Sequence, residues 1–478
     1  MRIVVVGAGV GGLATALELG RSGHEVVVVE RDDTPMPETP DAAFDWDRRG
    51  APQVRHSHAL LARLRNLLVE QHPDVHAALL EAGATEMRFG DDLPPGMEGF
   101  VREPGDDELV MIAARRTTFE WVLRRAVTES PNVDIRTGGA VVGLTGADGV
   151  VDGVTLADGT AIGADVVVLA NGRRGTIDEW VTSIGGAPID EEIDDTGIVY
   201  LSRFYRLRDD AGRPPRSGLI GGDLGYLKFG VFIGDSRTFS ITLAVPDNDP
   251  ELRKLLSEPE RFDDAARLLV PAADWLDGRA VPITPGVHVM AGLVNRWREM
   301  VPDGEPAALG LVGVGDAVLC TNPLYGRGCS TAFWSAHLLA DAIRAHGGDK
   351  RALALAYDMA LRDTLLPWYK SSVMQDTEAK RVAAAILAGE DPDGDTSDPR
   401  TFMRAVFREG LAPAMRSDPI VLRAVVRSLN LMSSPDALAE DPDVGARVLA
   451  VYEARHQREP EPPLGPTSRS EFLAGLAA

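Results

Sequence analysis

The chain opens on a short apolar run, a glycine-rich turn, a helical segment and a second apolar run. Arg2–Val6 and His24–Glu30 are the apolar runs, and both have the length and β-branched content of buried strands. Gly7–Gly12 forms the turn, and Leu13–Ser22 carries apolar residues at helical spacing. The pattern therefore predicts a strand–helix–strand unit at the start of the chain.

Two further regions have the period of β-structure. Between Val133 and Gly172, short β-type runs are separated by Asp-Gly turns, which predicts a meander leading into a strand at Asp165–Leu169. Ile198–Val245 is again β-like and rich in aromatic residues, so we expect a separate sheet there. Ala307–Gly315 predicts one more buried strand. The remaining patterns predict helices at His58–His72, Thr118–Glu129, Ser330–Ala345 and throughout the chain after Asp349, with loops at 31–50 and 390–398 and a Pro-rich linker at 459–466.

The composition is that of an ordinary globular protein with two or three domains. Of 478 residues, 44% are hydrophobic and 25% are charged. No segment approaches the ~20 apolar residues that cross a bilayer. Acidic residues outnumber basic ones by 72 to 49, and the net charge of -23 disfavours nucleic acid and anionic membranes as partners. The two cysteines, Cys320 and Cys329, and the glycines that interrupt the apolar N-terminus predict a reduced, cytoplasmic protein without a signal peptide.

The loop Gly7–Gly12 has the spacing G-x-G-x-x-G of a dinucleotide-binding turn. Gly7 permits the tight turn, Gly9 lets the backbone approach a pyrophosphate, and Gly12 lets the helix pack closely on the strand. Glu30 closes the next strand, where it can accept hydrogen bonds from a ribose diol and would repel a 2′-phosphate. This unit predicts a site for NAD or FAD and leaves the choice between them open.

The region after the last predicted strand carries a second set of cofactor-type residues. Leu311–Ala317 has the sequence LVGVGDA, and Asn322–Ala332 has the sequence NPLYGRGCSTA at the start of a predicted helix. The Asp316 carboxylate can accept hydrogen bonds from hydroxyl groups, and amides at a helix N-terminus can stabilise negative charge. These segments resemble the FAD-dependent monooxygenases of the para-hydroxybenzoate hydroxylase fold. In that superfamily the aspartate contacts the ribityl chain and the Pro-x-x-Gly-x-Gly loop lies beside the flavin, so the resemblance implies FAD.

The resemblance also implies two weaker cofactor contacts. Arg116 matches an arginine that opens a helix near the cofactor phosphates or ribityl chain, with Arg115 as its competitor. Val142 matches a residue whose backbone meets adenine. The alternatives are an ordinary surface arginine and a core valine. The cofactor-binding residues that we predict are Gly7, Gly9, Gly11, Gly12, Glu30, Arg31, Arg116, Val142, Asp316, Pro323, Gly326, Gly328, Cys329 and Ser330.

A narrower resemblance concerns Pro52–Leu61, with the sequence PQVRHSHALL, and Ser428–Asn430. Both are similar to segments of a bacterial subgroup that includes the polyether epoxidases, which act on polyketide alkenes. The likeness places Arg55 or His58 near the flavin as candidate catalytic residues, where a cation or donor steadies the reduced cofactor. The alternative is that Gln53–His58 only caps the following helix and packs the loop. No further His or Cys cluster at ligand spacing follows, so no metal is predicted.

One departure from the family concerns the supply of electrons. The aromatic hydroxylases of this fold carry an Asp-Gly motif associated with nicotinamide use, and this chain has ANGRR at the same place, Ala170–Arg174. A second glycine fingerprint after a strand is also missing from the sequence. These departures disfavour direct reduction by NAD(P)H, so we expect NAD(P)H as the electron source through a separate flavin reductase as partner.

The resulting hypothesis is a flavoprotein oxidoreductase, a FAD-dependent monooxygenase of secondary metabolism. Its C4a-hydroperoxyflavin would insert one oxygen atom from O2 into an electron-rich small molecule by epoxidation or hydroxylation. The alternatives are a FAD-dependent reductase of the geranylgeranyl reductase type, a non-catalytic flavin-binding protein and a dehydrogenase that uses NAD without flavin. Aromatic residues of the second sheet are candidates for the substrate pocket, with plain core as the alternative: Tyr200, Phe204, Phe229, Phe232 and Phe239.

These features predict an α/β flavoprotein of two domains with a helical C-terminal region. The Rossmann-like FAD-binding domain is discontinuous and comprises residues 1–45, 105–190 and 285–348. The substrate domain, a β-sheet inserted between those stretches, comprises residues 46–104 and 191–284. Residues 349–478 form the helical region.

Overall fold

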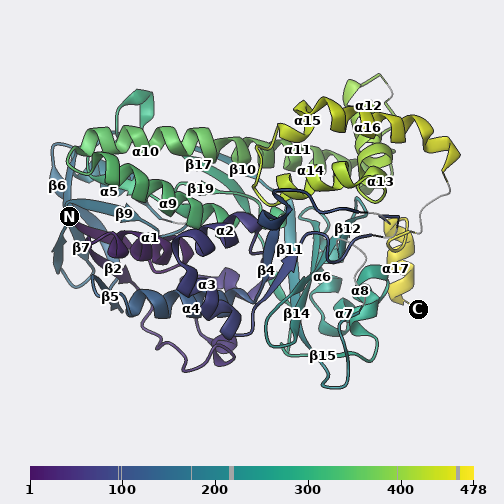
Figure 1. Cartoon of the computed structure of the whole chain (residues 1–478), viewed down its shortest axis with the longest axis horizontal. Helices are drawn as coiled ribbons and strands as arrows, with labels where there is room; N and C mark the ends of the chain where they lie inside the picture. The colour runs from purple at the N-terminus through teal and green to yellow at the C-terminus, as the bar shows by residue number, and fades with distance from the viewer. Residues whose placement is uncertain are drawn as a thin grey trace.

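The computed structural model describes residues 1–94, 96–97, 100–173, 175–214, 220–395, 397–458 and 463–477. A five-stranded parallel sheet with the order β18-β9-β1-β2-β5 lies at one end of the molecule (Figure 1). Such a sheet is buried on both faces, which is why β18, β9, β1 and β2 are mainly apolar runs, whereas the edge strand β5 has the sequence VDIRT and is largely exposed. The strands are β1 (Arg2–Val6), β2 (Glu25–Glu30), β5 (Val133–Thr137), β9 (Val166–Leu169) and β18 (Leu311–Gly313).

The two faces of this sheet have different covers because successive side chains of a strand point to opposite sides. Ile3 and Val5 pack against one set of helices, whereas Val4 and Val6 pack against a small antiparallel sheet and one short helix. The helical cover is α1 (Val10–Arg21), α4 (Arg116–Thr128) and α9 (Gly328–His346). The opposite cover is β6 (Val141–Ala147), β7 (Val150–Leu156), β8 (Ala161–Gly163) and α5 (Ile177–Ser183).

A second, antiparallel sheet fills the other half of the molecule (Figure 1). Its order is β12-β13-β14-β11-β15, and β16 also pairs with β11. Four helices, α6 to α8 and α17, cover its back face over a large apolar core. The strands are β11 (Ile198–Leu207), β12 (Gly221–Asp223), β13 (Lys228–Ile233), β14 (Thr238–Pro246), β15 (Ala280–Pro282) and β16 (His288–Met290). The helices are α6 (Pro250–Leu256), α7 (Pro259–Arg267), α8 (Val270–Leu276) and α17 (Arg469–Ala477).

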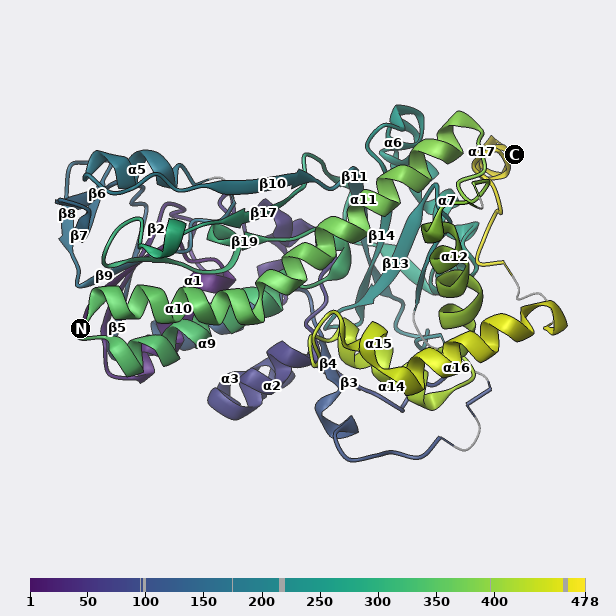
Figure 2. The ribbon, with the colours of Figure 1, turned by 90° about the horizontal axis from the view of Figure 1, so that it is seen from above.

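The two halves are joined by shared strands and by one long helix. A three-stranded sheet connects them, and α11 (Leu366–Ala388) runs from beside α10 (Lys350–Thr364) across to the second sheet (Figure 2). The joining strands are β10 (Glu191–Asp195), β17 (Val294–Arg298) and β19 (Leu319–Cys320). A separate hairpin consists of β3 (Thr85–Arg88) and β4 (Val110–Ala113). It lies beside α2 (Ala62–Gln71) and α3 (Pro73–Glu81). The chain ends in α12 (Pro399–Val406), α13 (Ala412–Ala414), α14 (Pro419–Leu429), α15 (Ala437–Glu440) and α16 (Pro442–Glu453) before α17.

The α/β class, the Rossmann-like parallel sheet and the separate β-sheet are confirmed. The five parallel strands come from the three separated stretches 1–45, 105–190 and 285–348. The domain boundaries themselves stay a prediction. Residues 459–462 of the expected Pro-rich linker lie outside the described residues.

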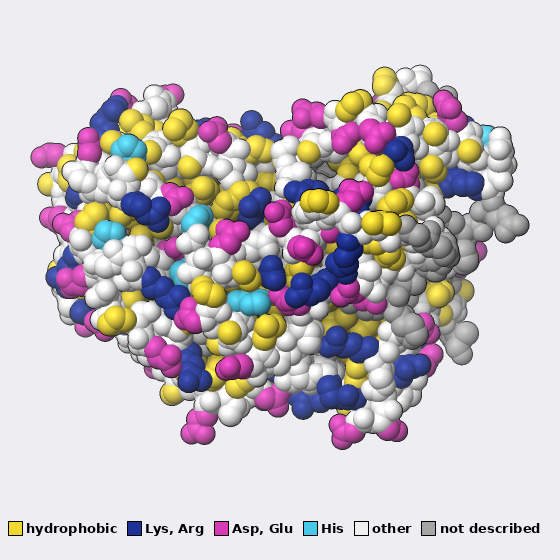
Figure 3. All heavy atoms as spheres, in the orientation of Figure 1, with side chains coloured by type: hydrophobic (Ala, Val, Ile, Leu, Met, Phe, Trp, Pro, Cys, Tyr) yellow, Lys and Arg dark blue, Asp and Glu magenta, His cyan; other side chains and the backbone are white. Residues whose placement is uncertain are grey.

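Charged side chains of both signs are spread over the surface shown in Figure 3. Figure 3 shows acidic and basic side chains interspersed over one face, so the net charge of -23 does not form a single block there. Among the helices that the structure describes, none combines the length and the apolar character needed to span a membrane.

Candidate active site

The glycine loop lies between the end of β1 and the start of α1. Gly7 has a φ of +107°, a conformation that favours glycine, and a Cβ on Gly12 would lie 1.9 Å from the Gly7 carbonyl oxygen. Gly9 is the N-cap residue of α1, and no side chain caps that helix. A Cβ on Gly9 would meet no protein atom within 4 Å. The loop therefore leaves open space in front of helix amides, which is the arrangement that binds anions.

The Glu30 side chain is hydrogen-bonded to the backbone of this loop. The buried Glu30 carboxylate accepts hydrogen bonds from the Ala8 amide at 2.9 Å and from the Asp32 amide at 3.1 Å. A carboxylate has about four acceptor positions. Glu30 thus holds the loop and keeps acceptor capacity for a ribose.

The second motif meets the first at the end of β18. A Cβ on Gly11 would lie 3.8 Å from Gly315 Cα and 3.7 Å from Ala332 Cβ, so the two glycine motifs are in contact. The half-buried Asp316 carboxylate makes no hydrogen bond or ion pair within the part of the chain that the structure describes. Burial raises the pKa of the Asp316 carboxyl, and Arg116 and Arg173 offset this only in part. The carboxylate is therefore an acceptor without a protein donor, as a contact to ribityl hydroxyls requires.

The start of α9 is equally open. Gly326 has a φ of +66° and ends a short turn, after which α9 begins at Gly328. A Cβ on Gly328 would meet nothing within 4 Å, and the buried Ser330 hydroxyl has no hydrogen-bond partner. Open amides, an unpartnered hydroxyl and an unpartnered carboxylate together fit FAD.

A buried ion network stands between the two motifs. Arg116, the first residue of α4, donates to Glu120 Oε1 at 2.6 Å and to the Cys329 thiol at 3.0 Å. Arg48 donates to Glu120 Oε2 at 2.6 Å and to the Ala8 carbonyl oxygen at 2.9 Å. Although burial alone would raise the pKa of Glu120, Arg48 and Arg116 hold it below its usual value. The network ties α4 to both glycine motifs.

The sequence pattern does not identify Arg48 as a site residue and does not decide between Arg116 and Arg115. Arg48 lies in an irregular loop without periodicity, so no local signal marks it. Arg116 lies beside the second glycine motif, whereas Arg115 makes an ion pair of 2.6 Å with Asp235 near the second sheet. Arg116 therefore occupies the position expected of the cofactor arginine, and its role stays a prediction.

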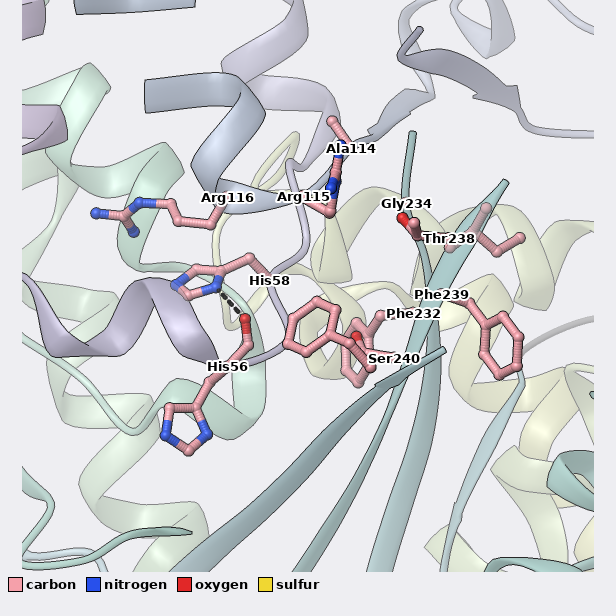
Figure 4. A pocket seen from close by; sticks show the side chains of 12 residues that line it. His56, His58, Ala114, Arg115, Arg116, Phe232, Gly234, Thr238, Phe239 and Ser240 are labelled. Atoms are coloured by element: carbon pink, nitrogen blue, oxygen red, sulfur yellow. Dashed lines mark hydrogen bonds between the residues drawn. The ribbon is translucent and has the colours of Figure 1, made fainter. Parts of the chain in front are cut away.

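A pocket lies between the N-terminus of α4 and the front face of the second sheet (Figure 4). Ser240, which lines this pocket, belongs to a hydrogen-bonded cluster in which Ser57 Oγ lies 2.7 Å from both Ser240 Oγ and Thr242 Oγ1. Ser202 Oγ joins the cluster at 2.8 Å from Thr242 Oγ1 and 3.1 Å from His56 Nδ1. The lining residues are His56, His58, Ala114, Arg115, Arg116, Phe204, Phe232, Ile233, Gly234, Thr238, Phe239 and Ser240.

Strand alternation separates the predicted pocket aromatics. Phe204 and Phe232 line the pocket, and Tyr200, on the same face of β11 as Phe204, donates to Asn322 Oδ1 at 3.2 Å. Phe229 belongs to the core behind the sheet. Phe239 lines the pocket, yet its ring stacks on Tyr205 in the same rear core.

His58 and Arg55 lie on the segment that leads into the pocket. His58 Nδ1 lies 3.0 Å from the His56 carbonyl oxygen, so a neutral ring donates there and leaves Nε2 as an acceptor. Burial lowers the pKa of His58 to about 3, with a contribution from Arg116, so the ring is neutral at pH 7 and is not a cation. The Arg55 guanidinium donates to the Phe44 and Trp46 carbonyl oxygens.

The capping part of the alternative for Gln53–His58 is wrong, and its packing part stays a prediction. No side chain of that segment caps α2, and the Ala62 amide instead donates to Asn430 Oδ1 at 2.9 Å. Asn430 belongs to the Ser428–Asn430 segment, which the sequence analysis singled out without assigning a role to it.

The remaining predicted residues lie away from this pocket or at its edge. Val142 is 52% exposed on β6, and the exposed Arg31 side chain lies 4.0 Å from Asp32. Asn171 Oδ1 is buried without a partner, and Arg174 lies outside the described residues. Both cysteines are free thiols, and the described residues contain no cluster of three metal-ligating side chains.

The neutral state of His58 predicts a pH dependence of stability. Since the pKa of histidine falls from 6.5 to about 3 on folding, only the unfolded chain takes up this proton between those pH values. The free energy of unfolding should therefore fall as the pH drops below 6.5. Between pH 7 and pH 5, His58→Gln is expected to lose less stability than the wild type, by on the order of 1–2 kcal/mol.

Urea unfolding of the apo protein at both pH values measures this difference. The control is His346→Gln, which replaces an exposed histidine and is expected to follow the wild-type profile. Equal losses of unfolding free energy in His58→Gln and wild type would show that folding does not lower the pKa of His58.

Comparisons with known proteins point to flavoproteins. Residues 2–44 match the family model described as FAD dependent oxidoreductase. Protein Rv3254 of Mycobacterium tuberculosis is 28% identical over 488 aligned positions, which cover 96% of each chain. Kynurenine 3-monooxygenase of Salinispora tropica is 27% identical over 372 positions, which cover 75% of this chain and 76% of that one.

A solved structure shares the fold over most of its length. PqsL, a probable FAD-dependent monooxygenase from Pseudomonas aeruginosa, superimposes with a TM-score of 0.57 at 17% identity. The match covers 81% of this chain and 99% of PqsL. The start of the chain thus matches the model of FAD dependent oxidoreductases, and the chain shares its fold with PqsL.

Proposed function

We propose that the protein is a FAD-dependent monooxygenase that inserts one oxygen atom from dioxygen into an electron-rich organic substrate. The observation that carries this proposal is the contact between the two glycine motifs beside the Asp316 carboxylate. It brings the N-termini of α1 and α9 to one region, next to the pocket that Arg116 also lines. The resemblance to FAD-dependent oxidoreductases and monooxygenases supports the same conclusion.

The chain's residues would divide the work of holding FAD. The open amides at Gly9 would hold the pyrophosphate, Glu30 the ribose and Asp316 the ribityl hydroxyls. The first amides of α9 would face the flavin ring and stabilise negative charge on it. Bound FAD, once reduced with electrons from NAD(P)H, would activate dioxygen, while the protein orients the substrate and keeps water away.

The pocket favours an uncharged substrate. Both arginines of its lining are paired, Arg115 with Asp235 and Arg116 with Glu120, and burial keeps both His56 and His58 neutral. Aromatic rings and hydroxyl groups therefore dominate the walls. Such a pocket suits a neutral, electron-rich alkene or phenol better than a carboxylate, because burying an unpaired charge is costly.

Two reactions remain open within this proposal. Epoxidation of an alkene needs no protein base, and the resemblance of Pro52–Leu61 to the polyether epoxidases supports it. Hydroxylation of a phenol gains from a proton acceptor, and the pKa of about 3 makes His58 a weak one. We propose NAD(P)H as the electron source and a separate flavin reductase as the partner that delivers the electrons.

The decisive experiment follows oxygen from dioxygen into a product. The purified protein, loaded with FAD, is given NADH or NADPH, with and without an added flavin reductase, and a panel of electron-rich alkenes and phenols. Labelled oxygen from heavy dioxygen should appear in the product, with the larger yield when the reductase is present. A protein without visible flavin absorption after incubation with FAD, or products free of the label, would refute the proposal.

A further inference from the structure

The long helix α11 presents a stripe of residues to the second glycine motif. Trp368, Ser372, Asp376 and Lys380 are spaced by four positions and therefore lie on one face of the helix. The first three are buried, and each contacts the segment 322–328 or its neighbours. Lys380 makes an ion pair of 3.1 Å with Asp194 on β10. Figure 2 shows α11 crossing the region that joins the two sheets.

Asp376 is the centre of this contact. Its carboxylate is 1% exposed and accepts three hydrogen bonds, from Asn295 Nδ2 at 2.7 Å, Asn322 Nδ2 at 2.7 Å and Tyr325 OH at 2.8 Å. Burial raises the pKa of the Asp376 carboxyl, and these hydrogen bonds act against that rise. A carboxylate is the only side chain of this size that offers acceptors alone, so it suits three converging donors.

The partners of Asp376 shape the turn that leads into α9. The Asn322 side-chain oxygen Oδ1 accepts hydrogen bonds from the Leu324 backbone amide at 3.0 Å and from Tyr200 OH at 3.2 Å. The backbone amide of Asn322 donates to Asn295 Oδ1 at 2.8 Å. Asn322 thus caps the turn Pro323–Tyr325 and connects it to the second sheet.

Arg327 adds a second attachment to the same helix. Its guanidinium donates to Ser372 Oγ at 2.9 Å and lies 4.7 Å from the ring centroids of both Tyr325 and Trp368. The residues before and after Gly326, Tyr325 and Arg327, are therefore both hydrogen-bonded to α11. These contacts fix the position from which the chain enters α9.

We propose that Asp376 is a positioning residue that holds the segment 322–328 where the first amides of α9 can stabilise the reduced flavin. The role of the C-terminal region is then to complete the cofactor site from behind. Because Tyr200 shares Asn322 with Asp376, the same contact also links the substrate sheet to the flavin loop. The part of this inference that concerns flavin rests on the proposed function, whereas the part that concerns the loop does not.

Asp376→Asn tests the inference with little change of shape. The new amide NH2 would face donors, so at least one of the three hydrogen bonds is lost. In the apo protein, hydrogen exchange of the amides of Asn322 and of residues 324–326 is expected to accelerate about tenfold or more. A tenfold loss of preference for reduced over oxidised FAD would lower the flavin midpoint potential by about 30 mV.

The matched control is Asp363→Asn, which removes an exposed carboxylate on α10 and should leave exchange and potential unchanged. Ser372→Ala removes the acceptor for Arg327 and serves if Asp376→Asn does not fold; it should shift both quantities in the same direction by less. A lower melting temperature with wild-type exchange at 322–326 and a wild-type flavin potential would overturn the inference. If neither variant nor wild type binds FAD, the proposed function fails, and the exchange rates still decide whether Asp376 holds the loop.

Discussion

Replacing Gly9 by alanine is expected to weaken FAD binding by about a hundredfold while leaving the stability of the apo protein almost unchanged. The new methyl group would meet no protein atom within 4 Å, and the backbone φ of -78° is allowed for alanine. It would instead stand where the pyrophosphate approaches the helix amides. A hundredfold corresponds to about 2.7 kcal/mol, which is the loss of one to two hydrogen bonds to a charged group at ~1.5–3 kcal/mol each.

Two matched variants make this prediction specific. Gly12→Ala would place its methyl group 1.9 Å from the Gly7 carbonyl oxygen, so it should destabilise the apo protein itself. Gly445→Ala, in α16, also enters open space but lies far along the chain, and it should leave FAD binding unchanged. The measurements are fluorescence titration with FAD and urea unfolding of the apo protein. If Gly9→Ala binds FAD like the wild type, the cofactor does not approach this loop.

The second large effect is expected at the buried ion network. Glu120→Ala should lower the free energy of unfolding by ~3–5 kcal/mol, because it leaves Arg48 and Arg116 buried without their shared carboxylate. The same change should weaken FAD binding, since Arg48 also holds the Ala8 carbonyl oxygen of the glycine loop. Chemical unfolding of the apo protein measures the first quantity.

Helix α4 supplies its own control for this experiment. Glu129 forms an i,i+4 ion pair of 2.9 Å with Arg125, as Glu120 does with Arg116, but both members of the Glu129 pair are exposed. Glu129→Ala is therefore expected to change the free energy of unfolding by ~0.5 kcal/mol or less. Similar losses in the two variants would mean that burial contributes little to the Glu120 network.

Local motifs made a large part of the site predictable. In the loop Gly7–Gly12 and around Asp316, each residue type serves a backbone or acceptor requirement that holds in any protein with this turn. Both segments take their shape from neighbours in sequence, so the strand–loop–helix pattern was enough to locate them. The likeness to flavoproteins rests on these same segments.

Residues whose role depends on distant partners could not be found in this way. Asn430 caps α2 from 368 positions away, and Asp376 meets Asn322 from 54 positions away. Arg48 and Glu120 are ordinary charged residues until folding buries them together. Phe229 and Phe232 look alike in sequence, yet strand alternation places the first in the rear core and the second in the pocket.

The sequence was enough to predict the parallel strands and the two glycine motifs, because those follow from short-range backbone geometry and residue chemistry. Tertiary structure alone decided which arginine reaches the second motif, that His58 is neutral and that α11 supports the turn before α9. Contacts across hundreds of positions and exclusion from water set these properties, and neither is encoded in a local pattern.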